Sequence, residues 1–149
     1  MKFYFKMKTL KKSLNLFLLL AFLSVNAQTT KDQLIGKWKG EDGKEIGYVT
    51  FDAQDYATFE INGRIIGGKE FNFEGKIGMM KYEIISQEKE LIKLDFVVTV
   101  FEKTKKVKRL MGIFKVIDYH TIEVALGFND IRPTEFNTDN SITLKREKN

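Results

Sequence analysis

The polar residues of this chain that could do chemistry are few, and they lie far apart in sequence. The single histidine, His120, stands two positions after Asp118 in a run of turn-forming residues. A nucleophilic relay needs a serine, a histidine and a carboxylate that converge, and the sequence places no serine beside this pair. One histidine and no cysteine also argue against a structural zinc site. We therefore expect His120 to be a solvated turn residue, with no catalytic residues, no metal and no cofactor.

Pairs of acidic residues are the next candidates, because glycosidases use two carboxyl groups about 5–10 Å apart across a cleft. Three pairs are close in sequence: Asp52 with Asp55, Glu88 with Glu90, and Asp130 with Glu135. The first two fall in predicted turns, where acids are simply well solvated, and catalysis is expected from none of the three. Asp95 differs because it lies within an apolar strand pattern, between Leu94 and Phe96. This alternation favours outward solvation of Asp95; on an inward face it would be the best polar candidate in a pocket.

Arg132 and Pro133 lie in a long predicted loop, residues 129 to 140. Pro133 fixes its own backbone and biases Arg132 towards an extended conformation. In the functional interpretation, Arg132 contacts an anion or a partner at the rim of the domain. The structural reading, which we favour, folds the loop across one end of the domain, where Arg132 bonds carbonyl groups and Phe136 plugs the base.

The elements that must position these residues read almost entirely as strands. Apolar and polar residues alternate with period two over about nine short segments between Leu34 and Glu147, with turn signals between them. Asn62-Gly63 is the strongest hairpin signal, and Gly67-Gly68 allows a bend or bulge. Thr30 and Gln33 fit a capping box, which indicates one short helical turn. The pattern suits a sandwich or a barrel, and we predict an up-and-down antiparallel β-barrel of about eight or nine strands.

Period-two counting also predicts which side chains face inward. The inward set is Trp38, Val49, Phe51, Ala57, Phe59, Ile61, Phe71, Phe73, Tyr82, Ile84, Leu94, Phe96, Val98, Ile122, Val124, Leu126 and Phe128. The candidates to line a ligand cavity are Phe51, Phe59, Phe71, Phe73, Tyr82, Phe96, Val98, Val124 and Leu126. In a barrel of this size such side chains either fill the interior or line one apolar cavity. The abundance of phenylalanine favours a filled or narrow interior.

The first 27 residues have the layout of a secretory signal peptide. Met1 to Lys12 holds five lysines and no acid, Ser13 to Val25 is an apolar run, and Val25-Asn26-Ala27 fits a cleavage site. The apolar run is about a dozen residues, against the roughly 20 that span a bilayer. We expect residues 1–27 to be cleaved and residues 28–149 to form one domain. No cysteine follows the run, so the prediction is a periplasmic or secreted protein, not a lipoprotein, without stable membrane insertion after cleavage.

Cleavage also changes the charge of the chain. The chain has 25 Lys and Arg against 20 Asp and Glu, so loss of the five leader lysines leaves 20 of each. A neutral domain lacks the field that steers proteins to phosphate backbones, and nucleic acid is not an expected partner. One basic run survives, consisting of Lys103, Lys105, Lys106, Lys108 and Arg109. A solvated hairpin turn is favoured there over a patch for anionic surfaces.

Two local patterns carry a resemblance to a known family. Gly36-Lys37-Trp38, just after the predicted helical turn, has the form of the Gly-x-Trp signature of lipocalins, and Arg146 lies on the last strand. In the second half, Gly112-Ile113-Phe114, the loop from Arg132 to Phe136 and the strand ending Leu144-Lys145-Arg146 follow in order. The chain resembles small exported bacterial lipocalin-like (calycin-type) domains of an uncharacterised family. It departs from them in Phe114, where they have tyrosine, and in lacking a cysteine between Ile122 and Leu126.

The resemblance implies that Gly36, Trp38 and Arg146 close the barrel, with the basic side chain over the indole. Such a contact contributes about 0.5–2 kcal/mol. Our first functional hypothesis is an exported domain that binds a small apolar or amphipathic ligand in the cell envelope. The alternative is a filled barrel that acts as a protein-interaction or inhibitor module through exposed loops such as residues 129–140. An enzyme is not expected, because no polar groups converge. The oligomeric state is not predicted.

Overall fold

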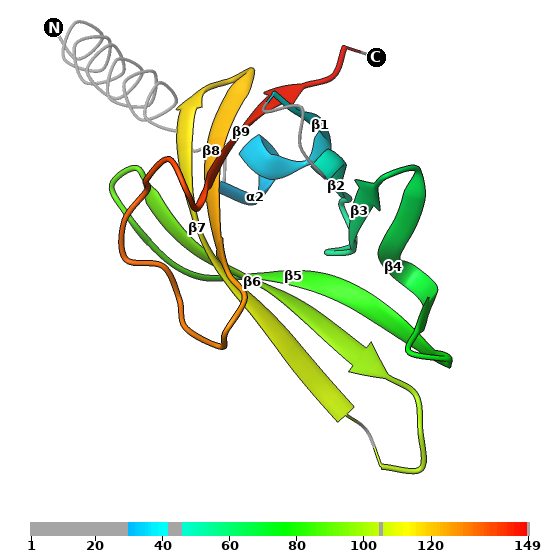
Figure 1. The fold of residues 1–149 in the computed structure, drawn as a ribbon. Coiled ribbons are helices and arrows are strands. Elements are labelled where there is room, and N and C mark those ends of the chain that lie inside the picture. The colour runs from blue at the N-terminus through cyan, green and yellow to red at the C-terminus, as the bar shows by residue number, and fades with distance from the viewer. Residues whose placement is uncertain (1–29, 42–45, 105, 149) are drawn as a thin grey trace, which may run out of the picture. The chain divides into compact units, whose positions relative to one another are not determined.

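The alternating segments fold into a single closed sheet. The computed structural model describes residues 30–41, 46–104 and 106–148, so the predicted signal peptide lies outside the described residues. The elements in chain order are α2 (Thr30–Leu34), β1 (Gly36–Gly40), β2 (Ile46–Phe51), β3 (Ala57–Ile61), β4 (Arg64–Phe73), β5 (Lys76–Glu88), β6 (Leu91–Val100), β7 (Lys106–Asp118), β8 (Thr121–Gly127) and β9 (Ser141–Arg146). Each strand pairs antiparallel with the next, and β9 pairs antiparallel with β1 (Figure 1). The predicted all-β antiparallel barrel, preceded by a short helical turn, is confirmed.

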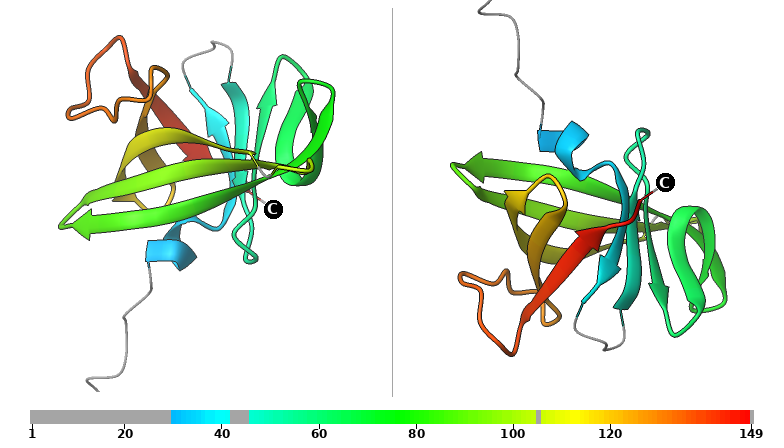
Figure 2. Two further views of the ribbon diagram at one scale, coloured as in Figure 1. Left: turned by 90° about the horizontal axis from the view of Figure 1, so that it is seen from below. Right: turned by 90° about the horizontal axis from the view of Figure 1, so that it is seen from above.

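Two glycine-containing turns shape the sheet where the sequence predicted them. Asn62 and Gly63 both have positive φ, of 50° and 75°, as the favoured two-residue hairpin turn requires. In β4, residues 64–67 pair with β3 and residues 68–73 pair with β5, so the strand turns a corner at Gly67-Gly68. Both glycines have positive φ, and a Cβ on Gly67 would overlap the carbonyl oxygen of Ala57. The predicted bend is confirmed, and β5 to β7 cross the other strands at a steep angle beyond it (Figure 2).

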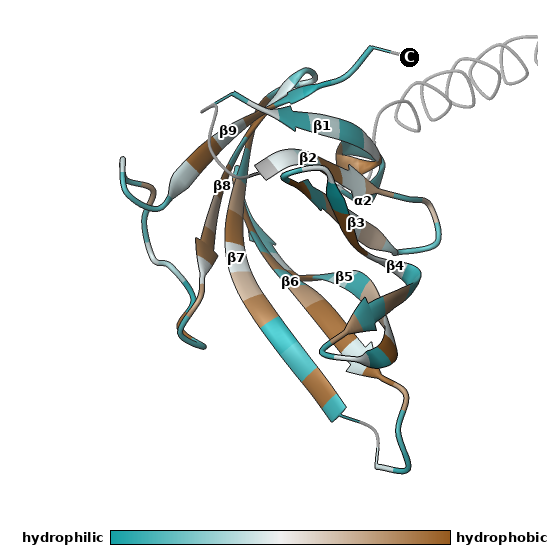
Figure 3. Cartoon of the chain, turned by 45° about the vertical axis from the view of Figure 1, so that its right-hand side comes forward, coloured by the Kyte–Doolittle hydropathy of each residue, from teal (hydrophilic) through white to brown (hydrophobic). Residues whose placement is uncertain are grey.

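Apolar side chains from every strand meet inside the barrel. The buried core consists of Leu34, Trp38, Val49, Phe51, Ala57, Phe59, Met80, Tyr82, Ile92, Leu94, Phe96, Phe114, Ile122, Val124, Leu126 and Leu144. Apolar and polar stretches follow one another along these strands (Figure 3). The prediction that Phe128 faces inward is wrong, since its side chain is 79% exposed. The reason is that β8 ends at Gly127 and the chain turns away from the barrel there. In the described part of the chain, no helix is long and apolar enough to cross a membrane.

Candidate functional site

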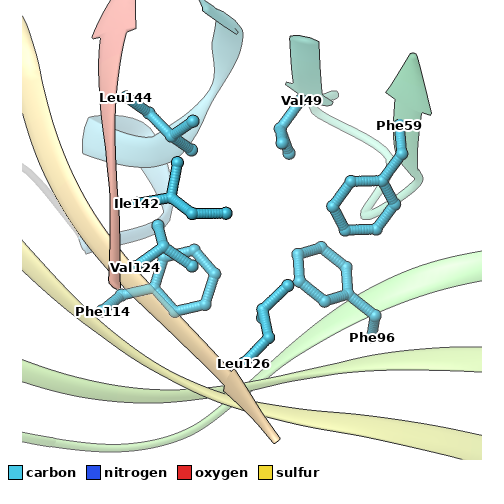
Figure 4. Close-up of a pocket in the computed structure, with 8 residues that line it drawn as sticks. All are labelled: Val49, Phe59, Phe96, Phe114, Val124, Leu126, Ile142 and Leu144. Atoms are coloured by element: carbon cyan, nitrogen blue, oxygen red, sulfur yellow. The ribbon is translucent and has the colours of Figure 1, made fainter. Parts of the chain in front are cut away.

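The interior of the barrel holds a small apolar cavity (Figure 4). Its lining consists of Val49, Phe59, Phe96, Phe114, Val124, Leu126, Ile142 and Leu144. The cavity volume is about 10 Å³, which is about the space that one water molecule needs. Pockets that bind small ligands measure about 300–1,000 Å³. A lipid-sized molecule therefore has no room in this cavity as the side chains stand.

Aromatic rings fill the space that a ligand would need. The ring centroid of Phe96 lies 4.7 Å from that of Phe59, 5.9 Å from that of Phe51 and 6.0 Å from that of Phe114. Phe51 also meets Tyr82 edge-on at 5.0 Å. Contacts of this kind stabilise a core by about 0.5–1.5 kcal/mol each beyond the area buried. The four phenylalanines come from β2, β3, β6 and β7, so they tie distant strands together.

The predicted lining residues have different fates in the structure. Four of them line the cavity: Phe59, Phe96, Val124 and Leu126. Phe51 and Tyr82 are buried in the core, whereas Phe71 and Val98 are partly buried against it. Phe73 is half-buried outside that core, with the ammonium of Lys108 4.9 Å from its ring centroid. Phe73 shares the face of Phe71, with ring centroids 6.0 Å apart, but β4 carries it past the corner and beyond the closed core.

The inward set omitted Phe114, which is fully buried at the centre of the core. Gly112 faces the same interior, and a Cβ on it would lie 3.0 Å from both Phe114 and Leu126 side-chain atoms. The small glycine therefore leaves the space that the phenylalanine ring occupies. Period-two counting from Gly112 to Phe114 is the sequence signal that could have found this residue.

Trp38 and Arg146 face each other where β1 meets β9. They are paired residues, and the guanidinium carbon of Arg146 lies 4.1 Å from the Trp38 ring centroid and 4.5 Å from that of Tyr119. The guanidinium donates to the carbonyls of Ile35 (2.6 Å), Gln33 (2.5 Å) and Tyr119 (2.8 Å). The indole N–H of Trp38 donates to the Leu34 carbonyl at 2.8 Å. This cluster joins α2, both closing strands and the β7–β8 turn.

Gly36 makes this arrangement possible. Its φ is +137°, and a Cβ on it would stand 2.6 Å from Nη1 of Arg146. A residue with a side chain would be strained in this conformation and would also displace the guanidinium. The structure thus brings together Gly36, Trp38 and Arg146, the three residues singled out for barrel closure.

Tyr82 ties the β2–β3 loop to the middle of β5. Its hydroxyl donates to the Asp52 carbonyl at 2.9 Å, and the Asp52 carboxylate accepts the backbone N–H groups of Gln54 and Tyr56. Burial, together with the nearby Asp55 and Asp52 carboxylates, raises the pKa of Tyr82 to about 12. This phenol therefore stays protonated at neutral pH and acts as a structural donor.

Asp95 is buried, which corrects the expectation that it is solvated. It does point to the outer face of β6, opposite the buried Leu94 and Phe96, but its side chain is only 5% exposed. Arg132 donates to Asp95 at 2.6 Å and to the Gly112 carbonyl at 2.8 Å, while Arg109 reaches Asp95 at 3.4 Å. The cause is the long loop, which folds back over the outer wall and covers the carboxylate.

The loop therefore follows the structural reading only in part. Arg132 bonds a carbonyl as that reading expects, and Pro133 is half-buried beside it. Phe136, however, is half-buried and outside the core cluster, so it does not plug the barrel. The ion pair between Arg132 and Asp95 instead holds the loop along the outer wall of the barrel.

The anchored loop exposes large apolar side chains. Phe128 is 79% exposed and Ile131 is 72% exposed, although Arg132, which follows Ile131, is held against the outer wall by Asp95. A Cβ on Gly127 would overlap the Ile131 carbonyl oxygen, so the chain folds tightly back on itself here. Further along, the Asn137 side chain accepts the backbone N–H groups of Asp139 and Asn140. Both ends of the loop are thus held in place by contacts of their own.

The other polar candidates lie in turns or on the surface. His120 is exposed in the β7–β8 turn, where its backbone N–H donates to Asp118 and lowers the pKa of that carboxyl. Asp55 pairs with Lys31 at 2.6 Å, and Glu90 pairs with Lys115 at 3.4 Å. Within residues 30–41, 46–104 and 106–148, no group of three or more His, Asp or Glu residues could hold a metal ion. These acids serve turns and surface ion pairs.

Fold and site together define a closed antiparallel β-barrel with a packed interior and one anchored surface loop. Comparisons with protein-family models, with curated proteins and with solved structures give no match to this chain.

Proposed function

We propose that this protein is a protein-interaction module, a filled β-barrel that presents the loop of residues 128–140 to a partner. The observation that carries this proposal is the contrast between Arg132 and its neighbours. Arg132 is held by a carboxylate that is 5% exposed, while Phe128 and Ile131 stand 79% and 72% exposed. Large apolar side chains on a pre-ordered loop bind a partner without a large ordering cost.

The small cavity supports this function over binding of a ligand inside the barrel. A space of about 10 Å³ among packed rings would have to open many-fold to admit a lipid. The predicted signal peptide supports a partner outside the cytoplasm. The stacking of Arg146 on Trp38 supports a lipocalin-like barrel, and that resemblance is part of the proposal.

The charge of the loop indicates the kind of partner surface that fits. Asp130, Glu135 and Asp139 are exposed and form no ion pair with another described residue, whereas Arg132 is occupied by Asp95. The loop surface is therefore acidic around two apolar anchors. A partner with an apolar pocket rimmed by basic residues would complement it.

Affinity capture from the envelope fraction of the producing organism tests the proposal. The bait is the chain from residue 28, as wild type and as the Phe128→Ser/Ile131→Ser variant. The matched control is Ile65→Ser, because Ile65 is 73% exposed on β4 rather than in the loop. We expect one protein to be recovered by the wild type and the control, and at least about tenfold less by the loop variant. Equal recovery by all three, or a lipid retained in native mass spectrometry without a protein partner, would contradict the proposal.

A further inference from the structure

β7 continues past the end of β8 and leaves part of its edge unpaired. The last residue of β8, Gly127, is paired with Met111 of β7. Among the described residues, no strand pairs with residues 106–110 on that side of β7, which projects beyond β8 in Figure 3. These residues follow the β6–β7 turn, so the predicted hairpin around the basic run is confirmed. A free strand edge of this kind is a template for another extended segment.

The residues that follow Gly127 in the chain complement this edge one by one. In the register of the β7–β8 pairing, each residue after Gly127 corresponds to a residue before Met111. Extended in that register, the segment of residues 128–131 would form four pairs with β7: Phe128 with Leu110, Asn129 with Arg109, Asp130 with Lys108 and Ile131 with Val107. The first and last pairs are apolar, and the third joins opposite charges.

Two of these pairs would lie on the inner face of the sheet. Leu110 is paired with the buried Phe96 and packs against the core, so Phe128 beside it would extend the apolar row inside the barrel. Lys108 is the next inner residue of the edge, and its present partner is the Glu74 carboxylate at 3.3 Å, in an exposed ion pair. An aspartate directly opposite this lysine is a stabilising cross-strand neighbour.

The other two pairs would lie on the outer face. Ile131 is 72% exposed and Val107 is 54% exposed, so each side chain would shield the other from water in this arrangement. The second outer pair is polar and stays in contact with water. One step further along the strands, Arg132 would stand opposite Lys106. Because like charges directly opposite each other are destabilising, the match ends at Ile131.

The structure holds this segment in a different conformation, which we call the loop state. In the loop state Arg132 is anchored to Asp95, a carboxylate that is only 5% exposed. The same state leaves Phe128 and Ile131 in water, and it gives Asp130 a φ of 56°, a region that residues with side chains rarely adopt. A strand would remove that φ and shield both apolar side chains, but it would give up the ion pair. Each conformation therefore has contacts that the other lacks.

The chain is long enough for the segment to reach the edge of β7. Ser141, the first residue of β9, is paired with Ala125 of β8. With β8 extended, Ile131 would lie about 20 Å along the strand from Ala125, at about 3.3 Å per residue. Residues 132–140 connect Ile131 to Ser141 and reach up to about 30 Å when extended. The segment can therefore pair with β7 while β9 keeps its place in the barrel.

We propose that residues 128–131 switch between the loop state and a strand state, in which they extend β8 along the free edge of β7 of the same molecule. The strand state covers Phe128 and Ile131, whereas the loop state presents them to a partner. The switch itself stands on the pairing register; its regulatory role rests on the proposed function. A partner that binds only the loop state shifts the equilibrium towards it, and the strand state lowers the apparent affinity of that partner.

Engineered disulfide formation detects the strand state directly, because the chain has no cysteine of its own. In the Val107→Cys/Ile131→Cys variant, the two thiols lie opposite each other only in the strand state. In the loop state the Ile131 carbonyl lies against Gly127, which pairs with Met111, about 13 Å along β7 from Val107. A disulfide joins Cα atoms at most about 7 Å apart. We expect this variant to form a disulfide within one molecule in dilute solution under a mild oxidant.

Three further variants make the test specific to this register. Val107→Cys/Thr138→Cys pairs the edge with an exposed residue elsewhere in the loop, and it should oxidise at least about tenfold more slowly. In the Val107→Cys/Ile131→Cys background, Arg132→Gln removes the anchor of the loop state and should speed oxidation by at least about threefold. Lys108→Glu sets two acids opposite each other in the strand state and should slow oxidation by at least about threefold.

Lys148→Glu is the matched charge reversal, because Lys148 is exposed near the C-terminus, and it should leave the oxidation rate unchanged. Circular dichroism checks that each variant keeps the folded barrel. The proposal is overturned if Val107→Cys/Ile131→Cys oxidises no faster than Val107→Cys/Thr138→Cys, or if its disulfide joins two molecules on a non-reducing gel. Equal rates for Lys108→Glu and Lys148→Glu in the same background would overturn the assigned register.

A separate arm tests the regulatory role. The reduced and oxidised forms of Val107→Cys/Ile131→Cys have the same sequence, so affinity capture with both compares the two states alone. We expect the oxidised form to recover at least about fivefold less of the partner than the reduced form. Equal recovery by both forms would overturn the regulatory role. If the wild type recovers no protein, the proposed function fails, while the oxidation rates still decide whether the switch exists.

Discussion

The guanidinium of Arg146 lies between the rings of Trp38 and Tyr119 and donates hydrogen bonds to three carbonyl groups. One side chain near the C-terminus therefore holds α2, β1 and the β7–β8 turn together. Because the last strand must pair with the first to close the barrel, this contact stabilises the longest-range pairing in the sheet. Closure is the feature on which the packed interior depends.

Replacing Arg146 should destabilise the protein strongly. Arg146→Ala removes three hydrogen bonds to carbonyls and the stacking on Trp38, and we expect a loss of about 2–4 kcal/mol. Arg146→Lys keeps the charge but not the planar fork, so its loss should be intermediate. Urea unfolding measures both, with the exposed Lys148→Ala as a control that should change stability by less than about 0.5 kcal/mol. Equal stability of Arg146→Ala and the control would remove Arg146 from the closing role.

Gly36 should be intolerant of a side chain for two separable reasons. In Gly36→Ala, a residue with a side chain must adopt the φ of +137°, and its Cβ lies close to Nη1 of Arg146. We expect a loss of folding stability of about 2–4 kcal/mol. Gly63→Ala is the matched control, since its φ is +75° but no atom lies within 4 Å, and it should cost about 1 kcal/mol. In an Arg146→Ala background the Gly36→Ala cost should shrink by about 1 kcal/mol or more. Strict additivity of the two changes would show that the close approach has no energetic effect.

The ion pair of Arg132 with Asp95 should hold the long loop against the barrel wall. Arg132→Gln leaves the buried carboxylate with the 3.4 Å contact to Arg109 as its one ion pair among the described residues, and we expect a loss of stability of about 2–4 kcal/mol. Arg109→Gln is the control on the same carboxylate; Arg109 is 41% exposed, so its loss should stay below about 1 kcal/mol. Chymotrypsin should cut the Arg132→Gln variant after Phe128 or Phe136 faster than it cuts the control. Similar cleavage of both variants would mean that the loop is held by other contacts.

Stability should fall at alkaline pH because of Tyr82. Its pKa in the folded protein is about 12, above the ordinary 10.0, so the folded state binds this proton more tightly than the unfolded state does. The resulting stabilisation is complete below pH 10 and is lost as the pH rises through about 12. The Tyr82→Phe variant should not show this alkaline loss of stability. Its stability at neutral pH should be lower by about 1 kcal/mol, because the hydrogen bond of the hydroxyl is removed. Urea midpoints that fall equally in both proteins between pH 10 and pH 12 would contradict the assignment.

Removing the central ring should turn the packed interior into a binding cavity. Phe96→Ala should reduce folding stability by about 3–5 kcal/mol and leave an apolar cavity. Phe96→Leu should reduce it by about 1–1.5 kcal/mol, and it serves as the folded variant if the alanine variant does not fold. Benzene should raise the melting temperature of a folded Phe96→Ala variant and leave the wild type unchanged. A comparable rise in the wild type would show that the interior opens, and would favour the hypothesis of an internal ligand.

The local pattern was sufficient for much of the closing cluster. Trp38 and Arg146 could be placed on inward faces because side chains alternate along any strand, whatever its partner. Asn62-Gly63 and Gly67-Gly68 could be placed at a turn and a bend because few residues tolerate positive φ. The fate of Asp95 could not be predicted in the same way. Strand alternation correctly placed Asp95 on the outer face, but a loop far along the chain covers its carboxylate.

The amino-acid sequence by itself determined the class of fold, because strand alternation, turn residues and the helix cap act over a few neighbouring residues. Only the tertiary structure decided what the barrel can do. It packed Phe51, Phe59, Phe96 and Phe114 against one another and left a cavity of about 10 Å³. It also exposed Phe128 and Ile131 on an anchored loop. Cavity volume and side-chain exposure depend on contacts between residues distant in the chain. A local sequence pattern does not show which distant side chains will contact a given residue.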